Sequence, residues 1–190
     1  MIEDESVFID IGTAQQKKNG QNAYGDFIAS KRYPEECRLI AVLSDGLGSG
    51  IKANILANMT ATMLLKFAAA ERNLIRAAET VMNALPVCQV RKISYATFSV
   101  ADCFEDGTVR IVEEGNPEFL HLHNGKVVPH ECEMIASQKF PERSMRTYVL
   151  HLEKDDRLLF YSDGVTQSGL GGSLYKLGWR RKGLIDFAES

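Results

Sequence analysis

Two aspartates occupy matching positions in two distant segments of the chain. Asp45 follows an apolar run in RLIAVLSDGLGSG, and Asp163 follows a similar run in RLLFYSDGVTQSG. Each aspartate belongs to a Ser-Asp-Gly tripeptide, so each carboxylate is expected where a buried strand ends. A third aspartate, Asp26, stands beside a glycine in NAYGDF, next to another apolar segment. Three carboxylates that converge at strand ends repel one another unless a cation lies between them.

The available donor atoms restrict the kind of cation. Carboxylate and carbonyl oxygens are ligands for hard ions such as magnesium, manganese or calcium. Gly46 permits a tight turn after Asp45 and offers its carbonyl as a further oxygen ligand. No cluster of histidine and cysteine suggests zinc, and the four cysteines form no CxxC motif. The pattern predicts a metal site, although Asp-Gly is also a common turn dipeptide, and a turn remains the alternative.

The glycine-rich segment GLGSG also resembles a phosphate-binding loop before a helix. A P-loop requires Gly-Lys-Ser/Thr, whereas Gly50 is followed here by Ile51 and Lys52. A dinucleotide-binding fingerprint requires GxGxxG within a βαβ unit, and neither the glycine spacing nor the downstream strand pattern agrees. Both nucleotide-binding motifs are therefore rejected.

The segments around these residues predict an α+β fold. Strands are expected at 7–14, 26–33, 38–45 and 93–104, the last paired with 108–115, and hairpins at 118–130 and 145–164. Helices are expected at 51–70 and 72–85, ended by Pro86, and from about 181. In the first helix, Met59 and Met63 are expected in the core. Because strands and helices do not alternate, two antiparallel sheets with helices packed outside are favoured over a parallel sheet.

Composition limits the partners. The 190 residues, 45% of them hydrophobic, are expected to form one domain, 1–190. Lys and Arg total 22 and Asp and Glu total 25, a net charge of −3, so neither nucleic acid nor an anionic membrane is an expected partner. The acidic N-terminus predicts no signal peptide, and no apolar run is long enough to span a membrane. We therefore expect a cytoplasmic protein with reduced cysteines.

Five motifs in order give the chain a resemblance to a known family. RLIAVLSDGLGSGIKAN resembles the signature of SpoIIE-type serine phosphatases, a bacterial branch of the metal-dependent PPM (type 2C) protein phosphatases. NAYGDF, YATFSV, EEGNPEFL and LLFYSDGVTQ resemble the other motifs of that family, and the resemblance runs from about residue 7 to 180. It implies an αββα sandwich, in which helical pairs flank two antiparallel sheets and a metal centre lies at one edge.

The resemblance also implies a reaction and a set of roles. Asp45 would bridge two manganese or magnesium ions, with the Gly46 carbonyl on one ion, Asp163 on the other and Asp26 acting nearby or through water. A water activated between the ions would hydrolyse phosphoserine or phosphothreonine without a covalent enzyme intermediate. The implied substrate is a phosphorylated anti-sigma-factor antagonist, or a similar phosphoprotein of bacterial partner-switching signalling. The helical pair at 51–85 would allow a homodimer and would act as a regulatory lever on the metal loop.

One departure from the family supports a second hypothesis. Members of the family normally end in Asp-Asp or Asp-Asn followed by Ile/Val-Thr, a metal-binding motif before the last strand, whereas this sequence ends in DFAES. We therefore expect residues 1–190 to lack the end of the final helix, the last strand and this motif, and to bind metal weakly. The alternative function is a phosphatase-fold module that binds a phosphoprotein without turnover.

Two further groups of residues are open to two interpretations. His121 and His123 alternate along a strand and share a face; they suit a metal, but solvent-facing strand residues are the expected reading. The cluster Trp179-Arg180-Arg181-Lys182 suits contact with an acidic partner, but a helix start with surface charge is expected.

Overall fold

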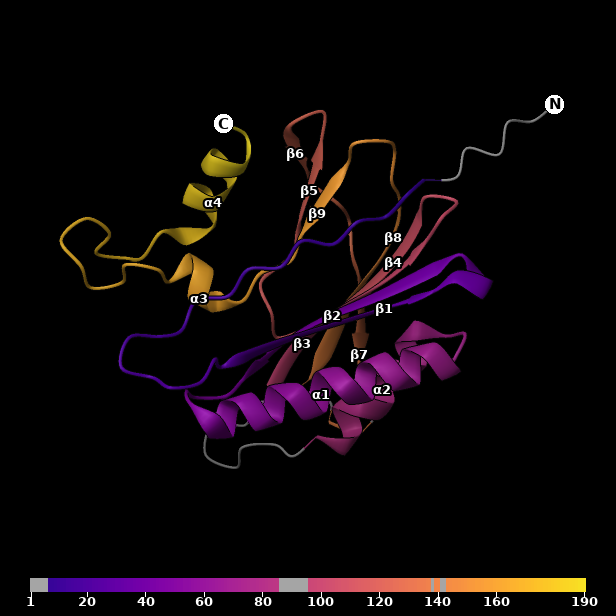
Figure 1. The fold of residues 1–190 in the computed structure, drawn as a ribbon, viewed down its shortest axis with the longest axis horizontal. Coiled ribbons are helices and arrows are strands. Elements are labelled where there is room, and N and C mark those ends of the chain that lie inside the picture. The colour runs from indigo at the N-terminus through magenta and orange to yellow at the C-terminus, as the bar shows by residue number, and fades with distance from the viewer. Residues whose placement is uncertain (1–6, 86–95, 138, 141–142) are drawn as a thin grey trace.

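The computed structural model describes residues 7–85, 96–137, 139–140 and 143–190, and its strands form two antiparallel sheets (Figure 1). The larger sheet has the strand order β1-β2-β3-β4-β8-β7 and the smaller one the order β6-β5-β9. The strands are β1 (Asp26–Tyr33), β2 (Arg38–Gly46), β3 (Ala96–Phe104), β4 (Thr108–Glu114), β5 (Leu120–His123), β6 (Lys126–Val128), β7 (Glu133–Ala136), β8 (Ser144–His151) and β9 (Arg157–Leu159). The helices are α1 (Ile51–Ala70), α2 (Leu74–Ala84), α3 (Asp163–Thr166) and α4 (Arg180–Ala188), with a 3-10 turn at Pro34–Glu36.

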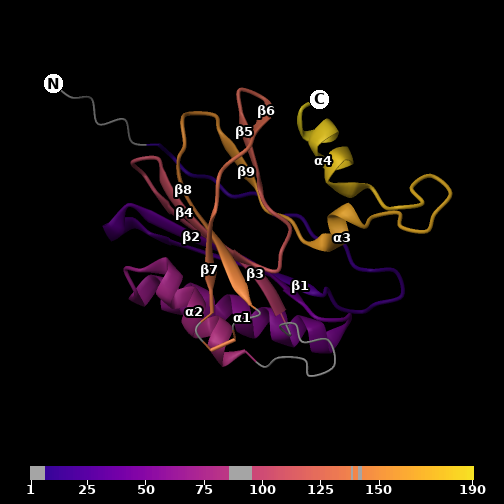
Figure 2. The same cartoon turned by 180° about the vertical axis from the view of Figure 1, so that it is seen from behind.

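The layers follow the order helix, sheet, sheet, helix. Helices α1 and α2 lie across one face of the larger sheet, and α4 lies beside the smaller sheet (Figures 1 and 2). One core cluster, with Phe98 and Leu64, joins α1 and α2 to the larger sheet, and a second, with Ile111 and Phe119, lies beneath its other face. A third, with Leu122 and Leu184, joins α4 to the smaller sheet. The expected αββα sandwich of two antiparallel sheets is confirmed.

Most of the side chains that helix α1 buries are small, and Leu64 is the large residue among them. Its fully buried positions include Ala53, Ala57, Ala61 and Ala68, which let the helix backbone approach the sheet closely. Met59 is 53% exposed, so the expectation that it belongs to the core is wrong, whereas Met63 packs against the core. Large residues such as Met59 also recur at helical spacing in α1. The face that packs on the sheet, however, is the one that carries the alanines and Leu64.

Two sequence expectations about strands are also wrong. Residues 7–14 form no strand, although the Val7 N–H donates a hydrogen bond of 2.7 Å to the Glu105 carbonyl. The segment 145–164 is not a hairpin, because β8 pairs with β4 and β7 while β9 pairs with β5 in the other sheet. Alternating hydrophobicity predicts a strand but does not identify its partner. Sequence reasoning also missed β7 and the short helix α3.

Several expectations concern residues without a described structure. Pro86, Cys88 and the first three residues of the strand expected at 93–104 lie outside the described residues. Within the described part, no helix is both long enough and apolar enough to cross a membrane.

Candidate functional site

The three predicted carboxylates come together at one edge of the larger sheet. Strands β1 and β2 pair in a register that sets Asp26 directly opposite Asp45. Asp163 is the first residue of α3, and the Ser162 hydroxyl before it donates a hydrogen bond of 2.7 Å to Asp26 Oδ2. The late Ser-Asp-Gly segment therefore meets the first aspartate, 136 positions earlier in the chain.

The pKa of Asp45 reflects its burial and the carboxylates around it. Burial is the largest cause that raises the pKa of Asp45; repulsion by, and hydrogen bonding with, the carboxylates of Asp26 and Asp163 add to it, and together they bring the pKa to about 8. Such a cluster lacks positive charge, which is the condition that a bound cation relieves. Among the described residues, however, no group of three or more His, Cys, Asp or Glu side chains is gathered closely enough to be a preformed metal site.

The glycines after Asp45 connect the strand to α1 by close backbone contact. A Cβ on Gly46 would lie 2.0 Å from the Ala53 carbonyl oxygen, so only glycine fits between the end of β2 and the first turn of the helix. Gly48 and Gly50 have φ of 101° and 74°, in the region that favours glycine, and Gly50 caps α1. The chain therefore turns sharply from the strand into the helix at this edge.

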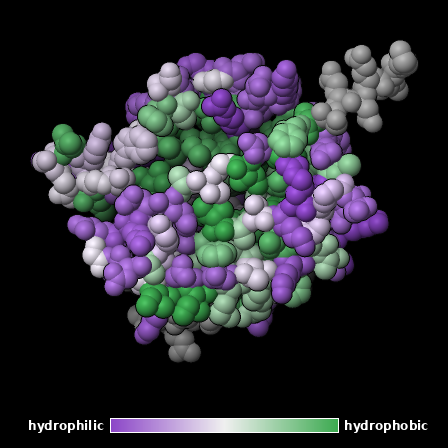
Figure 3. Space-filling view, in the orientation of Figure 1, coloured by the Kyte–Doolittle hydropathy of each residue, from purple (hydrophilic) through white to green (hydrophobic). Residues whose placement is uncertain are grey.

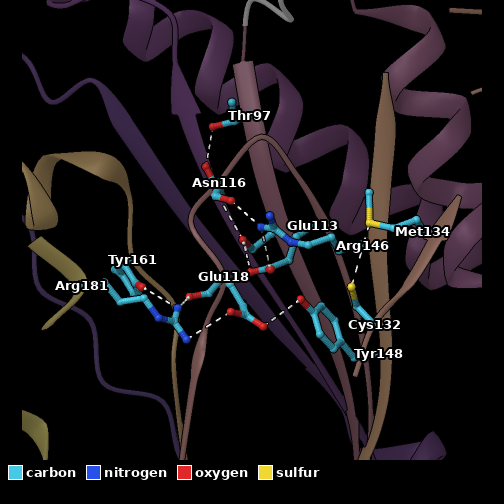
Figure 4. A network of polar contacts seen from close by, with 11 residues as sticks. Thr97, Glu113, Asn116, Glu118, Cys132, Met134, Arg146, Tyr148, Tyr161 and Arg181 are labelled. Carbon is cyan, nitrogen blue, oxygen red and sulfur yellow. Dashed lines mark hydrogen bonds and ion pairs between the residues drawn. The ribbon is translucent and has the colours of Figure 1, made fainter. Parts of the chain in front are cut away.

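A buried polar network supports β3 beside Asp45. Thr97 pairs with Asp45 across the β2–β3 register, and its carbonyl accepts a hydrogen bond of 2.8 Å from the Ser44 hydroxyl. The Thr97 hydroxyl donates to Asn116 Oδ1, and the Asn116 amide donates to Ser99 Oγ at 3.1 Å (Figure 4). The strand that faces Asp45 is thus held by side chains between the two sheets.

The network continues to an ion pair between a buried glutamate and a partly exposed arginine. The Ser99 hydroxyl donates to Glu113 Oε1 at 3.0 Å, and Arg146 pairs with Glu113 Oε2 at 3.1 Å (Figure 4). Burial raises the pKa of Glu113, while Arg146 acts to lower it. Sequence reasoning missed these residues, although EEGNPEFL already placed Glu113 and Asn116 inside a segment with a family resemblance.

Near Asp163, the structure has a pocket that the sequence did not predict. Gln167 donates from Nε2 to Asp163 Oδ2 at 2.8 Å. Gln167 also lines a pocket of about 450 Å³. The lining residues are Pro117, Glu118, Tyr161, Thr166, Gln167, Leu177, Arg180 and Arg181. Gln167 therefore belongs both to this pocket and to the surroundings of Asp163.

The histidines belong to a separate cluster. His121 and His123 share a face, as predicted, but His121 is only 6% exposed, so the solvent-facing interpretation is wrong for it. Asp156 lies between them, with Oδ2 at 3.1 Å from His121 Nε2 and Oδ1 at 2.7 Å from His123 Nδ1. His130 Nε2 lies 2.7 Å from His121 Nδ1 and completes the cluster. These side chains satisfy one another's hydrogen bonds within the smaller sheet and its loops.

Several solved structures have the same fold as this chain. The RsbU and RsbW domains of Rv1364c from Mycobacterium tuberculosis match with a TM-score of 0.68 and 19% identity, over 90% of this chain and 47% of that chain. The PP2C phosphatase domain of SpoIIE from Bacillus subtilis, with a fragment of its regulatory domain, matches at 0.66 and 19%, over 81% and 45%. The S. agalactiae serine/threonine phosphatase matches at 0.58 and 17%, over 97% and 92%. This chain spans about half the length of the first two, and at these identities the likeness establishes the fold.

The sequence comparisons establish the family. A search of curated protein sequences found no match. The family model described as Stage II sporulation protein E (SpoIIE) matches residues 35–187, which is most of the chain. The same stretch holds Asp45, Gly46 and Asp163. The chain therefore belongs to the SpoIIE family, on the fold of the PP2C-type (PPM) phosphatases.

Proposed function

We propose that this chain is a divalent-metal-dependent protein serine/threonine phosphatase. The observation that carries the proposal is the convergence of Asp26 and Asp163 on Asp45, whose pKa of about 8 marks a site in need of positive charge. Membership of the SpoIIE family supports the same reaction. Similar structures include RsbX in complex with magnesium, which supports a hard divalent cation.

The oxygen donors at this edge are of the kind that manganese and magnesium take, and two ions belong to the proposal. Asp45 would contact both ions, the Gly46 carbonyl and Asp163 one each, and Asp26 would act directly or through water. When bound, such ions activate water and neutralise the charge of a phosphoryl group. Ser162 orients Asp26 through its 2.7 Å hydrogen bond, and Gln167 orients Asp163. The protein thus contributes oxygen ligands of set direction, which is what hard cations require.

The proposed substrate is a phosphorylated signalling protein in the cytoplasm, such as an anti-sigma-factor antagonist. The similar structures support this class, since they include RsbU and RsbW domains and a protein of the bacterial stressosome. A homodimer through the α1–α2 pair also belongs to the proposal. Ile51, Ile55 and Met59 are 68%, 51% and 53% exposed along α1, and hydrophobic side chains gather at the lower edge of Figure 3, where α1 lies.

The test is hydrolysis of p-nitrophenyl phosphate and of a phosphoserine protein, with and without manganese. We expect manganese-dependent turnover by the wild type and a loss of at least about a hundredfold in Asp45→Ala, since one metal-bridging ligand disappears. Asp186→Ala is the matched control, because Asp186 lies on the surface of α4 in an ion pair with Lys182. Equal rates for wild type and Asp45→Ala would contradict the catalytic assignment.

A second candidate is a phosphatase-fold module that binds a phosphoprotein without turnover. It is favoured by one observation: the described residues contain no preformed group of three or more metal-binding side chains. Calorimetric titration with manganese separates the two candidates. Binding of two ions that disappears in Asp45→Ala supports the enzyme, whereas phosphoprotein binding without manganese binding supports the module.

A further inference from the structure

A pocket of about 450 Å³ contains two arginines, Arg180 and Arg181. Thr166, the last residue of α3, and Gln167, which follows it, line one side of the pocket. The Gln167 side chain donates a hydrogen bond to Asp163 Oδ2 at 2.8 Å. Gln167 thus belongs both to the pocket and to the surroundings of Asp163.

Backbone contacts place Arg180 at the pocket. The loop after α3 returns to it at Gly178, where a Cβ would lie 2.8 Å from the Thr166 carbonyl oxygen. The Trp179 N–H then donates to the Ser168 carbonyl at 2.9 Å. Arg180 follows with φ of 65°, a conformation that a non-glycine residue rarely adopts. Packing against α3 rather than local preference thus sets the position of Arg180.

The two arginines of the pocket differ in their partners. Arg181 donates to the Glu118 carbonyl at 2.7 Å and to the Tyr161 hydroxyl at 3.1 Å, and it pairs with Glu118 Oε2 at 3.2 Å (Figure 4). The Arg180 side chain has no hydrogen bond, ion pair or ring contact with any residue that the structure describes. Because Arg181 balances the charge of Glu118, the charge of Arg180 is left over in the pocket.

We propose that this pocket binds a carboxylate side chain of the phosphoprotein, an aspartate or glutamate near the phosphorylated residue, and that Arg180 recognises it. The inference rests on the proposed function and adds a determinant of substrate choice. A guanidinium forms two parallel hydrogen bonds to a carboxylate, which provides direction as well as charge. Pro117 and Leu177 line the same pocket and offer apolar contact for the methylene groups of the bound side chain.

The experiment measures peptide binding rather than turnover. A set of fluorescent peptides carries the non-hydrolysable phosphonate analogue of phosphoserine, with one glutamate moved along an otherwise uncharged sequence. Each peptide has a twin with glutamine in place of that glutamate. Fluorescence anisotropy with manganese present gives the affinities. Trp179, the one tryptophan of the chain, precedes Arg180 and provides a second, intrinsic signal.

At one position of the glutamate, the wild type should bind the glutamate peptide about tenfold more tightly than its twin, the size of one charge-assisted contact. In Arg180→Gln this ratio should fall to within about twofold, and Arg180→Lys should retain part of it. Lys182→Gln is the matched control, since Lys182 lies on α4 in a surface pair with Asp186, and it should keep the full ratio. Arg180→Glu should instead favour a lysine peptide.

Three outcomes would overturn the proposal. The first is a wild type that shows no glutamate preference at any position, and the second is a preference that survives in Arg180→Gln. The third is a loss in Arg180→Gln of the preference for phosphonate over plain serine, since Arg180 would then bind the phosphoryl group itself. If the wild type does not distinguish phosphonate from serine, the proposed function fails together with the subsite. If only the glutamate preference is missing, the subsite alone fails.

Discussion

The two ends of strand β2 lie beside carboxylates in opposite surroundings. At its beginning, Arg38 pairs with Asp102 of β3, with Nε at 2.5 Å from Oδ1 and Nη2 at 2.8 Å from Oδ2. Both residues are buried, at 6% and 0% exposure, and Arg38 also donates to the Ala68 carbonyl at the end of α1. At the end of β2, Asp45 faces Asp26 and Asp163, two further negative charges.

The difference separates a charge that the fold balances from one that the fold leaves without a counter-charge. Asp102 has a complementary cation built into the fold, so its charge joins the sheet to α1. Asp45 is buried and has carboxylates as neighbours; burial first and the like charges second raise its pKa to about 8, and both cost the folded chain free energy. A bound cation would remove this free-energy cost. The same chemical group, a carboxylate, thus stabilises the fold at one end of β2 and destabilises it at the other.

The largest effect on stability is expected at the paired end. Asp102→Asn removes the buried counter-charge of the Arg38 guanidinium and leaves it only the exposed carboxylate of Glu36, at 3.1 Å, so it should lower the free energy of unfolding by about 3–5 kcal/mol. Urea denaturation measures the loss. Asp186→Asn, which removes a surface ion pair with Lys182, should change it by less than about 0.5 kcal/mol. A loss below about 1 kcal/mol in Asp102→Asn would contradict the structural role.

The corresponding substitution at the other end should have the opposite sign. Asp26→Asn removes a like charge facing Asp45 while its side-chain oxygen still accepts from Ser162. In EDTA it should raise the free energy of unfolding by about 0.5–1 kcal/mol, a rise of a few degrees in the midpoint of thermal unfolding. Manganese at a hundredfold excess over its dissociation constant should stabilise the wild type by about 2.7 kcal/mol and the variant much less. Destabilisation of Asp26→Asn in EDTA would break the comparison.

The pH dependence of the metal-free protein should report Asp45 directly. Its pKa in the folded chain is about 8, against an ordinary value of 3.8, so the folded state holds the extra proton between these values. The stability contribution is therefore full below pH 3.8 and is lost as pH rises through 8. Relative to Asp45→Asn, the wild type should lose stability progressively over this interval, by urea denaturation in EDTA. A difference that stays constant with pH would show that the pKa of Asp45 is not raised in the folded chain.

The smallest effect is expected at the histidine cluster, where the sign reverses. Burial and the neighbouring His121 lower the pKa of His130, and hydrogen bonds from Glu153, His123 and His121 lower that of Asp156 against the effect of its burial. Both contributions are present at higher pH. That of His130 is lost as pH falls below 6.5, and that of Asp156 is lost only at acidic pH. The free energy of unfolding of the wild type, measured above and below pH 6.5, should fall as the pH is lowered. In His130→Gln this fall should be smaller, and a fall of the same size would contradict the role of His130.

Local patterns predicted most of the secondary structure. The helices at 51–70 and 72–85, the Asn124-Gly125 turn and the central strand at 38–45 follow from hydrophobic period and turn chemistry, which act within a few residues. Pairing between distant strands is not encoded in such short windows. The sequence therefore does not predict that the segment 145–164 divides between two sheets. Helical spacing also does not identify which face of α1 is exposed, and the expectation of a buried Met59 is wrong for that reason.

The sequence alone determined which residues form the acidic cluster, because two Ser-Asp-Gly segments and Asp26 each follow or begin an apolar strand. Only the tertiary structure decided what surrounds them. The register of β1 on β2 brings Asp26 opposite Asp45, and the return of the chain at α3 adds Asp163 and Ser162. The lone charge of Arg180 likewise depends on which residues reach Arg181. Whether a charge is balanced depends on its neighbours in space, so it can be determined only from the folded structure.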